Sequence, residues 1–203
     1  LNLGYPTRVQ GSSTLLLQDC APNAQHVKLV FPARDNMPKV AMPEVEVHWY
    51  DGGMMPDRPE GFPQGKELMG EGGGLCIFHG TKDTLICGCY GVNPWLLSGR
   101  KPNVPQTLRR VKDAMKGGHE QDWIRACKES AGSRVQTKSN FLEAGPFNEM
   151  VVMGVLAVRL QRLNKELLWD GPNMQFTNIK DDEVVKILKK DDFKVVDGDP
   201  KFN

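Results

Sequence analysis

The stretch His-Glu-Gln-Asp-Trp-Ile-Arg-Ala-Cys-Lys, residues 119–128, separates two parts of the chain with different hydropathy patterns. The residues before it alternate between apolar and polar, as β-strands do, or are rich in proline and glycine. The residues after it show mainly the spacing of helices. Strands that are followed by helices in this way predict an α+β fold.

Residues 119–128 themselves predict a short amphipathic helix. Trp123 and Cys127 fall on the same side at helical spacing, so we expect both to point into the core. The ionisable His119 and Asp122 lie in the first turn, directly after two glycines, where we expect them to line a cleft. Capping its own helix is the alternative role of Asp122.

Residues 44–50 form the clearest predicted strand. Two sets of side chains alternate along it: Val45, Val47 and Trp49 on one face, and Glu46, His48 and Tyr50 on the other. Such alternation is typical of an antiparallel strand with one buried face. Residues 75–79 and 84–90, joined by four turn residues, predict a hairpin. Because this hairpin is apolar on both faces, we expect a second sheet to cover it, through self-association.

Residues 147–163 predict a helix that is apolar on nearly all sides between residues 150 and 158 and hence deeply buried. Pro146 suits its first turn. Gly154 would let a neighbouring backbone approach closely. Residues 166–169 predict a further short strand.

The composition argues against several classes of partner. The chain has 203 residues, of which 39% are hydrophobic and 25% charged, with a net charge of +1. No overall field therefore attracts nucleic acid or an acidic membrane. The basic loop at residues 93–115 contains Trp95 as its single aromatic residue, which favours a solvated loop over a nucleic-acid surface. The longest apolar run, residues 150–158, is far shorter than the ~20 residues of a membrane span. We therefore expect neither nucleic acid nor a membrane as a partner.

The cysteines predict neither a disulfide framework nor a metal site. There are five, an odd number in a chain too large to need covalent staples. Cys87 and Cys89 could form half of a metal site, but no second Cys/His pair lies at a matching spacing. We expect them to act as small buried apolar side chains.

No motif in the sequence predicts a catalytic constellation on its own. The glycine-rich run at residues 70–74 opens a strand, whereas a dinucleotide fingerprint opens a helix. His48 lies on the polar face of a strand and His79 borders a turn, so we expect both to be structural or solvent-exposed. The sequence contains no nucleophile-elbow motif.

Six tracts, taken together, carry a resemblance to a known family. They are residues 45–53 (Val-Glu-Val-His-Trp-Tyr-Asp-Gly-Gly), 87–94, 119–128, 139–147, 168–171 and 176–178. These tracts resemble the C-terminal domain of the Gfo/Idh/MocA oxidoreductases, in the branch abundant in Bacteroidetes and Planctomycetes. The resemblance extends from about His26 to Asn178, and it is specific for the family but not for a substrate.

The resemblance implies an open, mostly antiparallel sheet with helices packed on one face. Family proteins join such a domain to an N-terminal Rossmann domain that holds NAD(P), and they exchange hydride with a sugar or cyclitol. A Lys from a Glu-Lys-Pro motif and a His assist the proton transfer. This chain has no Glu-Lys-Pro and no glycine fingerprint, and it begins after the place where the family's catalytic His is expected. We therefore expect residues 1–203 to be a single C-terminal domain that binds no cofactor and has no oxidoreductase activity alone.

The resemblance also implies partners and a substrate-facing surface. We expect the missing Rossmann domain, a second copy bound through the sheet, and a carbohydrate substrate as partners, with NAD(P) in the full-length protein. The polar side chains available to line the substrate are Tyr50, Asp51, Asn93, His119 and Asp122. None of them matches a catalytic residue of the family.

Two other functions stay open at this point. One is the same domain in a glycosidase that uses tightly bound NAD during bond cleavage, and the other is a free-standing binding or scaffold module without catalysis. Any targeting signal would lie upstream of Leu1, so the compartment also stays open.

Overall fold

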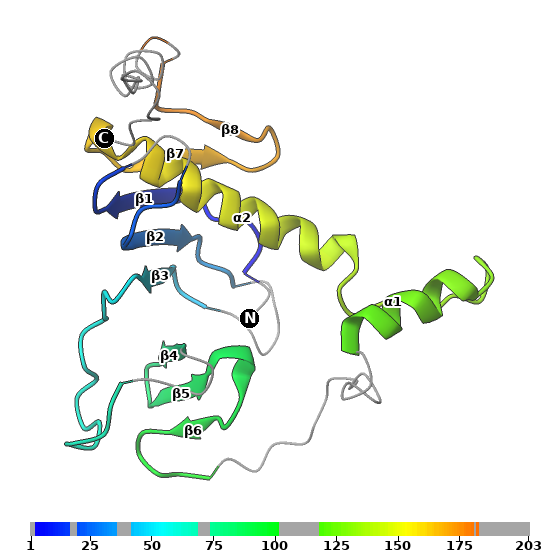
Figure 1. Ribbon diagram of the computed structural model, residues 1–203, viewed down its shortest axis with the longest axis horizontal. Helices are drawn as coiled ribbons and strands as arrows, with labels where there is room; N and C mark the ends of the chain where they lie inside the picture. Colours follow the sequence, from blue (N-terminus) through cyan, green and yellow to red (C-terminus); the bar gives the residue numbers. More distant parts are fainter. Residues whose placement is uncertain are drawn as a thin grey trace, which may run out of the picture. The chain divides into compact units, whose positions relative to one another are not determined.

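The computed structural model describes residues 3–16, 20–35, 42–68, 74–101, 118–180 and 182. The chain forms two compact units: Leu1–Met55 together with Val111–Asn203, and Pro56–Arg110. Each unit has its own sheet (Figure 1). Each also has its own hydrophobic cluster.

The sheet of the first unit has five strands in the order β3-β2-β1-β7-β8. These are β1 (Arg8–Ser13), β2 (Gln25–Phe31), β3 (Val45–Asp51), β7 (Leu167–Asp170) and β8 (Gln175–Phe176). Every pair of neighbouring strands is antiparallel, which confirms the predicted α+β class with an antiparallel sheet. Val45 and Val47 of β3 pack against the core and Glu46 and His48 are exposed, which confirms the predicted alternation for these residues. Trp49, predicted on the same face as the valines, is instead 60% exposed.

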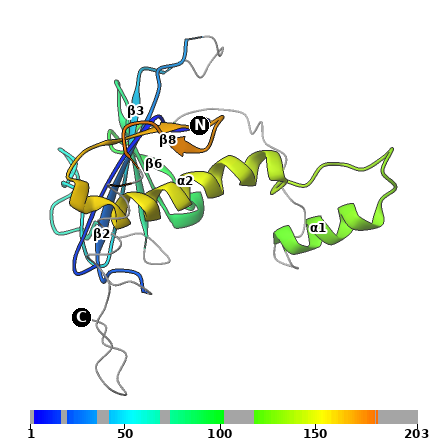
Figure 2. The same ribbon diagram turned by 90° about the horizontal axis from the view of Figure 1, so that it is seen from above.

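One face of this sheet is covered by α2 (Phe141–Arg159), which lies across the strands in both views (Figures 1 and 2). The side chain of Asn140 caps the helix by accepting a hydrogen bond from the Leu142 backbone nitrogen at 2.9 Å. The core between helix and sheet includes Val9, Val27, Leu29, Phe31, Met153, Ala157, Val158 and Leu167. Gly11 on β1 allows the close contact, because a Cβ there would lie 2.6 Å from the Val158 nitrogen.

The opposite face of α2 is apolar and exposed. It carries Phe141, Leu142, Phe147, Val151, Val152, Val155 and Leu156, whose exposed fractions range from 37% to 90%. The prediction of a deeply buried helix was therefore wrong. A helix on a sheet buries only the stripe that faces the sheet, and no other described segment covers the outer side. By length and composition α2 could also cross a membrane, a property it shares with many core helices.

The start of α2 and the role of its glycine also differ from the prediction. The helix begins at Phe141, because Asn140 supplies the cap, and Pro146 therefore lies inside it rather than in its first turn. Gly154 accommodates a side chain rather than a backbone, since a Cβ there would lie 3.4 Å from Cγ1 of Val27. The close backbone approach occurs at Gly11 instead.

The second unit is a three-stranded sheet with a loop packed on it. The strands β4 (Leu75–His79) and β5 (Thr84–Gly88) form the predicted hairpin, and β6 (Trp95–Leu96) pairs with β5. Ile86, only 1% exposed, packs with Phe62 and Leu68 from the irregular segment that precedes the hairpin. One apolar face of the hairpin is thus covered within the unit itself, which the sequence did not predict.

The helix α1 (Gly118–Lys128) forms where the sequence predicts it but buries a different side. Its buried residues are Asp122 and Ala126, whereas Trp123 is 64% exposed and Cys127 is also exposed. The expectation that Trp123 and Cys127 point into the core was therefore wrong. The buried side is fixed by a hydrogen bond that the Asp122 carboxylate accepts from the Lys138 backbone nitrogen, in the loop that follows the helix.

Candidate functional site

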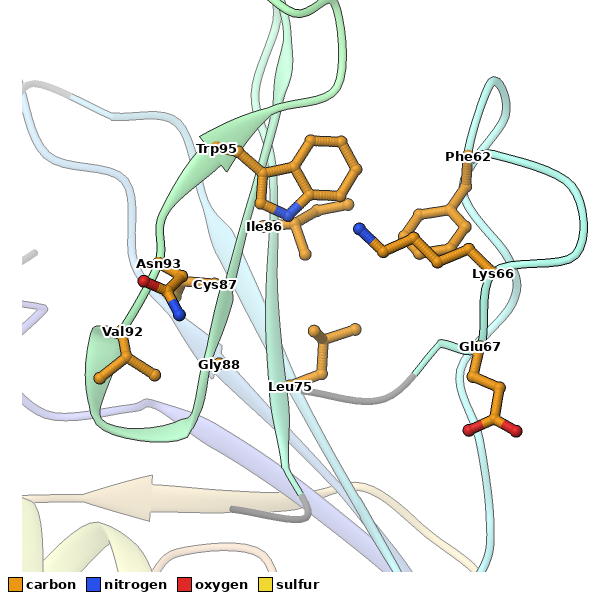
Figure 3. Close-up of a pocket in the computed structure, with 10 residues that line it drawn as sticks. All are labelled: Phe62, Lys66, Glu67, Leu75, Ile86, Cys87, Gly88, Val92, Asn93 and Trp95. Atoms are coloured by element: carbon orange, nitrogen blue, oxygen red, sulfur yellow. The ribbon is translucent and has the colours of Figure 1, made fainter. Parts of the chain in front are cut away.

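The second unit contains a pocket of about 290 Å³ between its sheet and the preceding loop (Figure 3). It is lined by Phe62, Lys66, Glu67, Leu75, Ile86, Cys87, Gly88, Val92, Asn93 and Trp95. All ten residues belong to this one unit, so the pocket depends on no contact with the other unit. A volume near the lower end of the ~300–1,000 Å³ range of small-molecule sites suits a ligand with a single ring.

Trp95 provides the largest apolar surface of the pocket. Its strand pairing sets it directly opposite Ile86, and its ring lies 5.9 Å from the ring of Phe62, tilted by 49°. Both neighbours are buried, so the indole is held against the unit's core rather than free to rotate. A fixed, partly buried indole is the kind of surface on which the apolar face of a ring can pack.

The loop opposite the sheet brings a cation to this aromatic wall. The Lys66 ammonium lies 4.8 Å from the centroid of the Trp95 ring. In Figure 3 its side chain reaches from the loop across the pocket, while that of the neighbouring Glu67 points away from the amine. The loop is held in place by Arg58, which donates hydrogen bonds to the carbonyl oxygens of Pro63 at 2.6 Å and Lys66 at 2.8 Å.

Asn93, one of the predicted substrate-lining residues, lies on the opposite side of the pocket from Lys66 (Figure 3). Its backbone has a φ of 49°, in the left-handed region that asparagine tolerates better than most residues. The preceding short helix η2 (Cys89–Gly91) ends in a turn that is closed by a hydrogen bond of 2.9 Å from the Gly88 nitrogen to the Val92 carbonyl. This turn sets the position of the Asn93 amide, which can both donate and accept hydrogen bonds.

The cysteines of this unit contribute packing. Cys87 is buried on the pocket wall and lies directly opposite Cys76 in the hairpin. Burial and the neighbouring Cys87 raise the pKa of the Cys76 thiol, which lowers its reactivity. Within the described ranges, no group of three or more His, Cys, Asp and Glu could hold a metal ion.

Tyr50 belongs to a different feature, a stack of rings on the sheet face opposite α2. The His26 ring lies 4.5 Å from that of Tyr50 and 5.3 Å from that of His48, measured between centroids. His26 Nε2 is 3.0 Å from His48 Nδ1, and His48 Nε2 is 3.2 Å from a carboxylate oxygen of Glu46. Burial, together with the charges of His48 and Lys28, lowers the pKa of His26. The prediction that His48 lies on the polar face is confirmed.

Charged side chains of both signs share this face with the rings. Arg8 binds Glu44 at 2.6 Å, and Lys28 binds Glu166 at 3.2 Å. All four side chains keep between 26% and 49% of their surface exposed. Such exposed pairs contribute little to folding, each about 0–1 kcal/mol.

Asp51 joins the ends of two strands. One carboxylate oxygen accepts a hydrogen bond from the Gln25 nitrogen at 3.1 Å, and the other accepts from Gln25 Nε2 at 2.8 Å and Trp49 Nε1 at 3.0 Å. These contacts fix the β2–β3 pairing and occupy the carboxylate that was predicted to line a substrate.

His119 and Asp122 both bind the segment that follows α1. His119 Nδ1 lies 2.8 Å from the Ser139 hydroxyl. The Asp122 side chain is only 3% exposed; its oxygens accept from Arg125 Nη2 at 3.0 Å and from the Lys138 nitrogen at 2.9 Å. Arg125 also binds Glu129 and the Val135 carbonyl, and the Glu129 and Asp122 carboxylates raise its pKa. Asp122 thus ties α1 to the loop after it.

The pocket residues other than Asn93 were not predicted from the sequence. Phe62 and Lys66 come from an irregular segment without any hydropathy period, and Trp95 was visible only as the lone aromatic residue of a basic loop. The one available signal was the clustering of an aromatic, a lysine and a glutamate within residues 62–67. Comparison with known protein families and with curated proteins yields no match for this chain.

Proposed function

We propose that the chain is the substrate-binding and oligomerisation domain of an NAD(P)-dependent oxidoreductase that acts on a sugar or cyclitol. The proposal rests on the positions in the fold of the six tracts that resemble the Gfo/Idh/MocA family. They occupy β3, the turn that ends at Asn93, α1, the start of α2 and the β7–β8 hairpin. These elements contribute an antiparallel sheet with a helix on one face, the architecture that the resemblance implies.

The pocket of the second unit supports a sugar as the ligand. Its aromatic wall suits the apolar face of a sugar ring, and Lys66, Glu67 and Asn93 offer hydrogen bonds to hydroxyl groups. Its volume of about 290 Å³ is too small for a dinucleotide, so we assign NAD(P) to a separate domain of the intact protein.

The outer face of α2 is the surface we assign to that cofactor-binding domain. Val151, Val155 and Leu156 are exposed within residues 150–158, which contain no charged residue. Exposed apolar patches of this kind mark contact surfaces, and two domains of one chain commonly meet through them.

The opposite face of the sheet is the surface we assign to a second copy of the chain. Arg8 lies beside Glu44 and Glu166, Lys28 lies beside Glu166, and His48 lies beside Glu46, so the face carries charges of both signs. A two-fold dimer requires a surface that is complementary to itself, and a face with charges of both signs can meet this requirement.

Cofactor binding tests the proposal. Calorimetric titration of the intact gene product with NADH and NADPH should show saturable binding of at least one of them. The 203-residue chain alone should show none, because it has no glycine fingerprint for the pyrophosphate. A gene product that binds neither nucleotide would favour the free-standing scaffold instead.

A further inference from the structure

We infer that the pocket of the second unit binds a monosaccharide that carries a carboxylate, such as a uronic acid. The inference rests on the proposed function for the sugar ring, and it goes beyond that function by naming the acid group. The observations that carry it are the Lys66 ammonium, which has no carboxylate partner among the described residues, the engagement of the neighbouring Arg58 elsewhere, and the shape of the walls.

The cation is the Lys66 ammonium. It points into the pocket and has Trp95 as its neighbour, and no carboxylate in the described parts of the chain lies within ion-pair distance of it. An ammonium over an exposed aromatic ring gains about 0.5–1 kcal/mol. A hydrogen bond to a charged group contributes about 1.5–3 kcal/mol, so a ligand carboxylate can compete with the ring for the ammonium.

The other basic group nearby is already engaged. Arg58 lies 4.7 Å over the Phe62 ring and donates to the carbonyl oxygens of Pro63 and Lys66. It therefore holds the loop that presents Lys66 instead of offering its own charge to a ligand. Glu67 also lines the pocket, but its side chain points away from the Lys66 amine in Figure 3, so the ammonium can take the negative charge of a ligand.

A carboxylate fits this site better than a phosphate. Phosphates are bound by several donors at once, commonly a helix N-terminus or paired arginines. The described part of the second unit has strands and one short 3-10 helix but no α-helix, so it offers no such N-terminus. Lys66 and the Asn93 amide, on opposite sides of the pocket, can instead hold a carboxylate and a ring hydroxyl (Figure 3).

The walls set the size and character of the remaining ligand. Ile86 and Leu75 form an apolar floor beside Trp95, and the volume of about 290 Å³ accommodates one ring. A pyranose ring has one apolar face and a rim of hydroxyl groups, which matches an indole wall with a polar rim. An aliphatic acid of the same charge would leave that rim unused.

The test is calorimetric and NMR titration of the 203-residue chain with glucuronate and with glucose, which differ only in the acid group. Galacturonate and galactose provide a second matched pair, and acetate provides the carboxylate without the ring. We expect each uronate to bind at least tenfold more tightly than its neutral partner and than acetate, with shifts at the Trp95 indole.

Substitutions in the pocket test whether it is the source of the preference for uronates over neutral sugars. Lys66→Met should abolish the preference for the acid, whereas Lys66→Arg should retain it. Lys82→Met, at the exposed turn of the same hairpin, is the matched control and should leave binding unchanged. Asn93→Gly keeps the left-handed backbone while removing the amide, and it should weaken all four sugars.

Three results would overturn the inference: equal affinity for a uronate and its neutral partner, acetate binding as tightly as a uronate, or no saturable binding at all. Its failure is separable from that of the proposed function. An intact protein that binds NAD(P) and oxidises only neutral sugars would leave the oxidoreductase in place and eliminate the acid group.

Discussion

The ammonium group of Lys66 lies 4.8 Å from the centre of the Trp95 ring, on the wall of a pocket built wholly within the second unit. This contact joins an irregular loop to a sheet strand. The contact also leaves the Lys66 ammonium facing the pocket. The fold does not need a positive charge at this position.

Lys66→Met should therefore have little effect on the stability of the second unit. The cation–π contact contributes about 0.5–1 kcal/mol at an exposed site, and methionine retains part of the packing on Trp95. Urea unfolding followed by tryptophan fluorescence should show a loss of no more than about 1 kcal/mol. A loss several times larger would make Lys66 a structural residue.

Gly11→Ala should strongly destabilise the first unit. The new Cβ would lie 2.6 Å from the Val158 nitrogen, so the helix backbone would have to move away from β1. We expect a loss of about 1–3 kcal/mol, as for overpacked cores. Gly132→Ala is the matched control, because nothing lies within 4 Å of its Cβ. A small effect of Gly11→Ala on chemical denaturation would show that α2 does not pack on β1 as described.

Asp122→Ala should loosen the segment after α1. The substitution removes the acceptor for Arg125 and for the part-buried Lys138 backbone nitrogen. Arg125 keeps Glu129 and the Val135 carbonyl as partners, so the main loss is the hydrogen bond from Lys138 to the carboxylate, which contributes about 1.5–3 kcal/mol. Amide hydrogen exchange should accelerate at Lys138 and along α1, and Glu120→Ala, on the exposed side of the same helix, should not have this effect. If exchange is unchanged in both variants, Asp122 does not anchor the loop.

The His26 stack should make the first unit less stable as the pH falls. The pKa of folded His26 lies below its ordinary value of 6.5, so the unfolded chain takes up the proton first. Stability is thus full above about pH 6.5 and declines as the pH falls through that value and through the folded pKa. His26→Asn should flatten this decline, and His48→Asn should raise the pKa of His26 in an NMR titration by removing a neighbouring charge. His79→Asn, in the other unit, is the control. A His26 pKa at or above 6.5 would contradict the prediction.

The features of this fold that were predictable are those encoded by neighbouring residues. The alternation of Val45 to His48 in β3 and the β4–β5 hairpin follow from local periodicity and turn residues, and both are confirmed. The burial of α2 and the orientation of α1 were mispredicted, because each depends on what lies against the helix. For α2 that is a sheet on one side only, and for α1 it is the Asp122 network. The Lys66–Trp95 pocket joins two segments with no hydropathy period, so no such period predicted it, and only the cluster of residue types at 62–67 pointed to it.

Turnover by the intact gene product tests the central claim most directly. Incubated with NAD+ or NADP+ and a panel of neutral and acidic sugars, the protein should form one reduced nicotinamide for each oxidised sugar, with the product identified by mass spectrometry. Cleavage of a glycoside without net reduction of the nucleotide would contradict the oxidoreductase and favour the NAD-dependent glycosidase. No conversion of any sugar by a protein that is folded and loaded with nucleotide would contradict both.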